Sequence, residues 1–246
     1  MIRFILEFLF LFVYLLVSIF VLLFCLLVGL FNKKACNVMI FRFVTWGFRC
    51  VTFFSGVKLT VIGEENIPDD RPVLFIGNHR SIFDIVITYG RMKHLCGFVS
   101  KKENKNLPVI SLLMRHLYCE FLDRDDIRNG MQMILNCIDH IKNGVSVFIY
   151  PEGTRNKTNE PLIEYHAGSF KIAEKSGCTI IPVTVNHTEE IFENQFPRIR
   201  PAHVVLEYGA PVETASLSRD EKKQIPAKVM DIIKETYLRN QEITFD

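Results

Sequence analysis

The chain has 246 residues, which is long enough for one large α/β domain or for two small domains. Its 29 Lys and Arg residues against 27 Asp and Glu residues give a formal net charge of +2, a balance that argues against nucleic acid as the main partner. The charge is unevenly distributed, because residues 1–60 carry a net +5 and residues 61–246 therefore sum to −3.

The most hydrophobic segment comes first. Residues 8–31 form an uncharged run of 24 residues. As a helix this run would be about 36 Å long, enough to cross a bilayer core of about 30 Å. A cleaved signal peptide is the alternative, but its apolar region normally has about 7–15 residues and a small-x-small cleavage site, which is missing here. We predict a membrane anchor, and Lys33 and Lys34 directly after it place the following chain in the cytoplasm.

A second apolar segment, residues 38–59, is interrupted by Arg42 and Arg49, which lie seven positions apart and on one side of a helix. This pattern favours a helix at the membrane interface, with Trp46 near the headgroups. An ordinary buried core helix is the alternative. We therefore predict an N-terminal membrane anchor and interfacial helix over residues 1–56, followed by a separate domain over residues 57–246.

Seven cysteines are present, without a C-x-x-C pair and without the His/Cys spacing of a metal site. We therefore expect reduced cytoplasmic thiols and no metal.

Short β-branched and aromatic runs alternate with helical stretches after residue 56, which predicts an α/β fold with a mixed, largely parallel sheet flanked by helices. The predicted strands lie near residues 57–62, 72–76, 95–99, 118–122, 145–150, 180–186 and 203–208. The predicted helices lie near residues 82–90, 107–116, 126–142, 168–176 and 227–239. "SRDE" at 218–221 is typical of a capping box, but Pro226 is expected to delay the last helix.

Ligands of open α/β sheets bind beyond the carboxyl ends of the strands, so the polar residues there are candidates for a site. "NHRSIFD" follows the second predicted strand and sets His79 five positions before Asp84. A histidine whose ring is held by a carboxylate can act as a general base near neutral pH. A G-x-S-x-G nucleophile motif is missing, which favours direct attack by a substrate hydroxyl. The alternative is that these residues are only turn and cap residues.

"YPEGTRN" follows the fifth predicted strand. Gly153 would let backbone N–H groups approach a ligand, and the planar guanidinium of Arg155 suits phosphate oxygens. Arg124 and Lys101 follow two other strands and could add positive charge at the same edge. The alternatives are a solvated turn and surface ion pairs.

Together these motifs resemble the 1-acyl-sn-glycerol-3-phosphate acyltransferase family of glycerolipid acyltransferases. "NHRSIFD" is similar to its N-H-x4-D motif, "EFLDR" to its second motif, "YPEGTR" to its third and "IIPV" to its fourth, in matching order from about residue 57 to 210. The resemblance implies that His79 is the general base and that Asp84 orients it. It assigns substrate binding to Lys101, Arg124, Glu152, Gly153, Thr154, Arg155 and Pro182, with Pro182 helping to shape the acyl or substrate pocket.

The resemblance implies transfer of a fatty acyl group from acyl-CoA or acyl-acyl carrier protein to the sn-2 hydroxyl of lysophosphatidic acid, giving phosphatidic acid, without a cofactor. The partners would be membrane lipids and the thioester carrier, at a cell membrane with the catalytic domain facing the cytoplasm. Acylation of glycerol 3-phosphate or of another lysophospholipid is an alternative. A membrane-bound lipid hydrolase, with His79 activating water, and a non-catalytic lipid-binding protein are alternatives from other classes.

The remaining histidines and one acidic cluster are expected to be structural or surface groups. The cluster is expected to face the dipole of a helix N-terminus rather than to bind calcium. The residues concerned are His94, His116, His140, His166, His187, His203, Asp123, Asp125 and Asp126.

Overall fold

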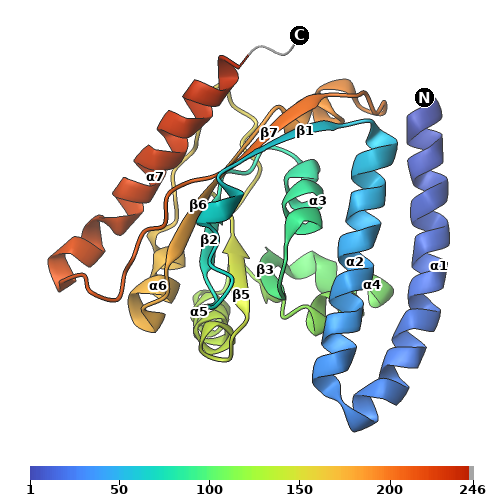
Figure 1. The fold of residues 1–246 in the computed structure, drawn as a ribbon, viewed down its shortest axis with the longest axis horizontal. Coiled ribbons are helices and arrows are strands. Elements are labelled where there is room, and N and C mark those ends of the chain that lie inside the picture. Colours follow the sequence, from blue (N-terminus) through green and yellow to red (C-terminus); the bar gives the residue numbers. More distant parts are fainter. Residues whose placement is uncertain (244–246) are drawn as a thin grey trace.

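A computed structural model describes residues 1–243 of the chain, in which two antiparallel helices lie alongside an α/β domain (Figure 1). The two helices are α1 (Ile2–Phe31) and α2 (Lys33–Ser55). Asn32 separates them, and its side chain accepts a hydrogen bond from the Ala35 N–H (3.0 Å), which caps α2. Gly56 ends α2 in the left-handed conformation, with φ of 73°.

A seven-stranded sheet forms the centre of the domain, in the order β1-β7-β6-β2-β5-β3-β4. Only the pairing of β6 with β7 is antiparallel, so the predicted α/β class with a mixed, largely parallel sheet is confirmed. The strands are β1 (Lys58–Ile62), β2 (Leu74–Gly77), β3 (Cys96–Lys101), β4 (Glu120–Leu122), β5 (Ser146–Ile149), β6 (Ile180–Asn186) and β7 (His203–Tyr208).

Helices cover both faces of this sheet (Figure 1). On one face α2, α3 (Ile82–Arg91) and α4 (Pro108–His116) contribute to one hydrophobic core. On the other face α5 (Ile127–Lys142), α6 (Lys171–Ser176) and α7 (Arg219–Gln241) contribute to a second core. The short 3-10 helices are η1 (Glu64–Asn66), η2 (Lys102–Asn106), η3 (Ala167–Phe170), η4 (Thr188–Glu190) and η5 (Glu193–Gln195).

Helix α2 is amphipathic, and its two faces fit the two interpretations of its sequence, a buried core helix and a helix at the membrane interface. Its inner face buries Ile40 and Phe41 in the same core as Phe75 of β2, whereas Arg42 and Trp46 are exposed on its outer face. The hydrophobic core therefore extends across the predicted domain boundary at residue 56.

The start of α7 differs from the prediction. Ser218 and Glu221 form a capping box, the helix begins at Arg219, and Pro226 lies inside it. Proline at this position removes one N–H donor, and the burial of Ile225 and Val229 on either side holds the helix in place.

The expectation that all cysteines are reduced thiols is wrong for one pair. Cys25 of α1 and Cys36 of α2 form a disulfide with a Cα–Cα distance of 5.3 Å. The tight connection between the two helices brings these positions face to face, although no spacing motif marks them. Each cysteine is 1% exposed, which keeps soluble reductants away from the bond.

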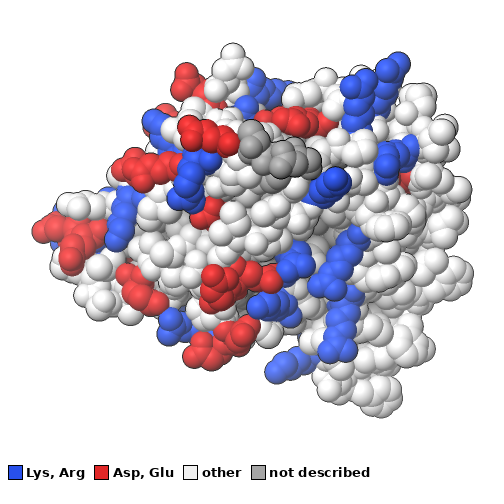
Figure 2. Space-filling view, turned by 45° about the horizontal axis from the view of Figure 1, so that its top comes forward, with Lys and Arg blue, Asp and Glu red and all other residues white. Residues whose placement is uncertain are grey.

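Both N-terminal helices are long and apolar enough to cross a membrane by length and composition. Most side chains of α1 are exposed, and only Glu7, Ser18 and Cys25 of this helix are buried. Figure 2 shows a row of Lys and Arg side chains beside a broad uncharged surface on the side of the molecule that α1 and α2 form.

Candidate active site

The carboxyl end of β2 is held firmly by Asn78. Its side-chain amide donates to the Val185 carbonyl and accepts from the Val185 N–H, both at 2.9 Å, and so joins the end of β2 to β6. Because β5, β2 and β6 are parallel neighbours, the residues that follow these three strands meet at one edge of the sheet. His79 is the first residue beyond this anchor.

His79 and Asp84 lie side by side, as the motif predicts. Asp84 is fully buried at the start of α3, and its Oδ2 accepts from His79 Nδ1 at 2.8 Å. The same oxygen accepts from the N–H groups of Arg80 (2.6 Å) and Ser81 (2.8 Å), and Oδ1 accepts from the Thr188 hydroxyl. An ionised carboxylate only accepts hydrogen bonds, so Nδ1 carries the proton and Nε2 is the nitrogen that can act as a base.

Two further groups support the His79 ring and backbone. The ring stacks on Tyr150 with a centroid distance of 4.4 Å. Glu152 is buried, and its two oxygens accept from the N–H groups of His79 (2.8 Å) and Ile163 (3.2 Å). Burial raises the pKa of Glu152 to about 7, although the two N–H bonds favour its charged form. Glu152 thus holds the backbone of His79 in position.

In the turn after β5, Gly153 is half-buried and Thr154 and Arg155 are exposed. Gly153 has a φ of 65°, which strains any other residue, and an added Cβ would lie 3.0 Å from the His166 ring, which would have to shift. Arg155 projects over the start of α3 and donates from Nη1 to Glu193 Oε1 at 2.9 Å.

Arg80 connects the loops around His79. Its guanidinium donates to the carbonyls of Thr158 (2.8 Å) and Glu160 (3.0 Å) and to the Glu189 carboxylate (3.1 Å). It also lies over the ring of Tyr237 at 5.6 Å from the centroid. No sequence pattern had pointed to Arg80.

The segment after β6 was missed as well. It brings Thr188 to Asp84, Glu189 to Arg80 and Glu193 to Arg155. The available signal was its position, because "HTEEIFENQ" directly follows the carboxyl end of a strand that pairs with β2.

Three predicted substrate-binding residues lie outside the two motif loops around His79. Lys101 ends β3 and Arg124 follows β4, and both are exposed. β4 is three strands away from β2, which at about 4.8 Å per strand is roughly 14 Å. Pro182 is buried within β6 opposite Ile76, and its carbonyl accepts from the Gly209 N–H at 2.8 Å.

Some of the other histidines do have acidic partners. His140 contacts Glu120 (2.9 Å) and His187 contacts Glu190 (3.0 Å). In the described residues, one group could hold a metal ion, namely Cys25, Cys36 and His116, whose ligand atoms lie within 4.8 Å of one another. Its two sulfurs are joined in the disulfide, which leaves the imidazole as the only ready ligand.

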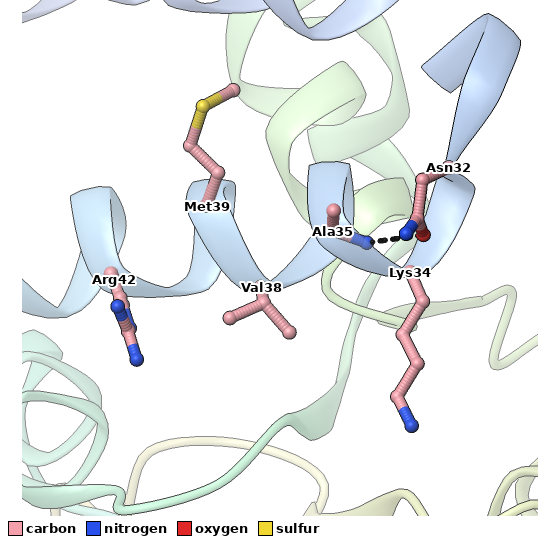
Figure 3. A pocket seen from close by; sticks show the side chains of 6 residues that line it. All are labelled: Asn32, Lys34, Ala35, Val38, Met39 and Arg42. Atoms are coloured by element: carbon pink, nitrogen blue, oxygen red, sulfur yellow. Dashed lines mark hydrogen bonds between the residues drawn. The ribbon is translucent and has the colours of Figure 1, made fainter. Parts of the chain in front are cut away.

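An open hollow of about 480 Å³ lies beside the first turns of α2, between Asn32 and Arg42. Figure 3 shows Lys34, Val38 and Arg42 pointing to the same side of the helix, as their spacing of four residues requires. Within residues 1–243 the hollow is lined only by the start of α2 and by Asn32 before it, and none of the predicted site residues lines it. Its size therefore does not identify it as the active site.

A sequence profile of the family described as Acyltransferase matches residues 58–186, which include both motif loops around His79. The chain belongs to this family. The match covers β1 to β6 and ends where the segment carrying Thr188 and Glu193 begins.

Relatives of this acyltransferase chain carry one recurring name. It is 26% identical over 183 residues to the 1-acyl-sn-glycerol-3-phosphate acyltransferase of Saccharomyces cerevisiae, covering 74% of this chain and 60% of the relative. It is 28% identical over 184 residues to the protein of that name from Borreliella burgdorferi, covering 74% of this chain and 72% of the relative. The chain thus spans 60% and 72% of the length of these two relatives, and only about half or less of some others with that name.

A solved structure shares the fold. The crystal structure of the 1-acyl-sn-glycerophosphate (LPA) acyltransferase PlsC from Thermotoga maritima matches with a TM-score of 0.85 at 23% identity, covering 100% of this chain and 97% of that chain. The likeness includes the N-terminal helices as well as the sheet, because the whole chain is covered.

Proposed function

We propose that the protein transfers a fatty acyl group from an acyl thioester to the sn-2 hydroxyl of lysophosphatidic acid, giving phosphatidic acid. The hydrogen bond of 2.8 Å between His79 and Asp84, at the carboxyl edge of the sheet of an acyltransferase, is the observation that carries this proposal. The names of the relatives from yeast and Borreliella support the choice of acceptor.

The chemistry needs no group beyond those described. His79 Nε2 takes the proton of the acceptor hydroxyl while the oxygen attacks the thioester carbonyl carbon. The carbon–sulfur bond then breaks, and the leaving thiolate takes the proton back from the imidazolium. Asp84 stabilises the imidazolium and keeps Nε2 directed away from itself. Arg155 binds the acceptor phosphate, because a guanidinium can make two charge-assisted hydrogen bonds in a plane.

We place the reaction at a cell membrane, with the domain facing the cytoplasm. The exposed apolar surface of α1 supports burial in lipid, and the cationic residues Lys34 and Arg42 beside it suit anionic headgroups. Lys33 and Lys34 suit the negatively charged cytoplasmic leaflet, which supports the cytoplasmic side.

Product identification tests the proposal. Purified protein is offered acyl-CoA or acyl-acyl carrier protein with lysophosphatidic acid, with glycerol 3-phosphate, or with a lysophospholipid that lacks the phosphomonoester. We expect phosphatidic acid from lysophosphatidic acid, and the donor assay decides between the two carriers. Release of free fatty acid without an acceptor would identify a hydrolase instead, and no turnover in any arm would favour a lipid-binding protein.

Arg155 gives a sharper test of the acceptor. We expect Arg155→Ala to lower kcat/KM for lysophosphatidic acid by about one to two orders of magnitude or more, since even one charge-assisted hydrogen bond contributes roughly 1.5–3 kcal/mol. Arg155→Lys keeps the charge without the fork and should be intermediate. A neutral monoacylglycerol lacks the phosphate, so its slower reaction should change much less. An unchanged ratio of the two specificity constants would make Arg155 a merely structural turn residue.

A further inference from the structure

The carboxylate of Glu193 occupies a site formed by both motif loops. Its Oε1 accepts from Arg155 Nη1 and from the Ile82 N–H, both at 2.9 Å, and its Oε2 accepts from the Ser81 hydroxyl at 2.6 Å. Ser81 and Ile82 lie two and three positions after His79 in the chain. Three donors from two loops, one of which also carries the proposed base, therefore converge on this one carboxylate.

The same donors suit a phosphate group. A guanidinium, a hydroxyl and an N–H in the first turn of a helix are typical phosphate ligands. The Ser81 hydroxyl and the Ile82 N–H each carry one proton, so neither can bind Glu193 and a phosphate at full strength at the same time. Two anions on one guanidinium at this spacing would also repel each other. Binding of Glu193 and binding of an acceptor phosphate therefore exclude each other.

We propose that Glu193 is an internal latch that occupies the acceptor-phosphate position and must be displaced before the acceptor binds. This inference rests on the proposed function, because it assumes that Arg155 binds the acceptor phosphate.

The segment that carries Glu193 is suited to such a displacement. Residues 187–200 contain only the three-residue helices η4 and η5, so no long helix or strand holds Glu193 in place. The side chains of Arg155 and Glu193 are 41% and 22% exposed, which leaves the ion pair open to a competing anion. The neighbouring Phe192 stacks on Phe4 of α1 at 6.4 Å, and Phe196 is exposed. The latch therefore adjoins the end of the helix that we propose to lie in lipid, where the acceptor arrives.

A latch of this kind has a specific kinetic signature. Only molecules in which Glu193 has left Arg155 can bind the acceptor. The apparent affinity for every anionic acceptor is therefore the intrinsic affinity multiplied by the fraction of such open molecules. The chemical step is unaffected, because Glu193 has left the site by then. Removing the charge of Glu193 should therefore lower KM without changing kcat.

Glu193→Gln is the variant that tests this, because glutamine keeps the shape and loses the charge. We expect KM for lysophosphatidic acid to fall roughly three- to tenfold at unchanged kcat. Calorimetric titration with inorganic phosphate should show a Kd that is lower by the same factor, and KM for a neutral monoacylglycerol should not change. Glu190→Gln is the matched control, because this exposed carboxylate in η4 accepts from His187 and does not contact Arg155.

Three outcomes would overturn the latch. The first is an unchanged KM and an unchanged phosphate Kd in Glu193→Gln. The second is a fall in kcat, which would show that Glu193 supports the active arrangement. The third is the same gain in Glu190→Gln, which would indicate a general charge effect. The calorimetric arm needs no turnover, so it tests the latch even if the wild-type protein transfers no acyl group and the proposed function fails. Glu193→Ala repeats the test if the glutamine variant does not fold.

Discussion

Asp84 has two structural roles. It orients the ring of His79, and it also accepts from two N–H groups of the turn and from Thr188, so it holds the start of α3 in place. The His79 side chain, by contrast, makes a hydrogen bond only to Asp84 among the described residues and holds no part of the turn. The two members of the pair should therefore respond differently to mutation.

We expect His79→Ala to lower turnover by about 10²- to 10⁴-fold or more with little effect on stability, because it removes the base and leaves the other hydrogen bonds of Asp84 intact. Asp84→Asn should lower turnover and also reduce the free energy of unfolding by about 1–3 kcal/mol, since the amide opposes one of the buried donors. Thermal unfolding and rate assays on both variants separate the effects. Unchanged stability in Asp84→Asn would show that asparagine accepts the hydrogen bonds of the turn as well as aspartate does.

The sequence revealed His79 and Asp84 because they lie within one local motif, where strand, turn and cap signals agree. Thr188 is 104 positions from Asp84, and Glu193 is farther still. Their contacts depend on the pairing of β6 with β2, which no local pattern encodes. Long-range partners of this kind are the part of the site that could not be predicted.

At the scale of elements, the strands were predicted closely because short β-branched runs are bounded by turn residues. The start of α7 was missed because the helix-breaking tendency of Pro226 was given more weight than the capping box at Ser218, and tertiary burial of the helix decided otherwise. For α2, the arginines predicted a helix at the membrane interface, and the structure adds that its inner face belongs to the core.

The two N-terminal helices should therefore differ when they are removed. Deleting residues 1–31 removes only three buried residues and should leave the domain folded but no longer recovered with liposomes. Deleting residues 1–56 also removes Ile40, Phe41, Val44 and Val51 from the core, a loss of about 6–12 kcal/mol at 1.5–3 kcal/mol each. That loss is comparable with the whole stability of a domain, about 5–15 kcal/mol.

Circular dichroism and liposome sedimentation of both truncated proteins check this expectation. A folded protein lacking residues 1–56 would show that the domain is independent of α2. Equal liposome recovery of the protein lacking residues 1–31 and the full chain would show that α1 is not the anchor.

At the scale of the whole molecule, the packing of α2 bears on how the protein sits in a bilayer. α2 packs against α4 near its start and against α3 farther along, and α1 packs on α2. If α2 crossed the bilayer, these domain helices would be drawn into the lipid with it. Charged side chains such as Arg115 of α4, which is exposed, make that arrangement costly. We therefore expect both helices to lie along one face of the membrane.

Trp46 can report which arrangement occurs, because it is the only tryptophan in the chain and its side chain is half exposed. It lies two residues from the middle of α2, or about 3 Å along the helix axis. In a crossing helix Trp46 would sit near the bilayer centre, and lipids brominated at the end of the acyl chain would quench its emission most. In a helix lying at the interface, lipids brominated near the headgroup should quench most, and this is the result we expect. Aromatic rings with a polar N–H favour that depth. Strongest quenching from the chain ends would instead support a crossing helix and require α2 to separate from the domain.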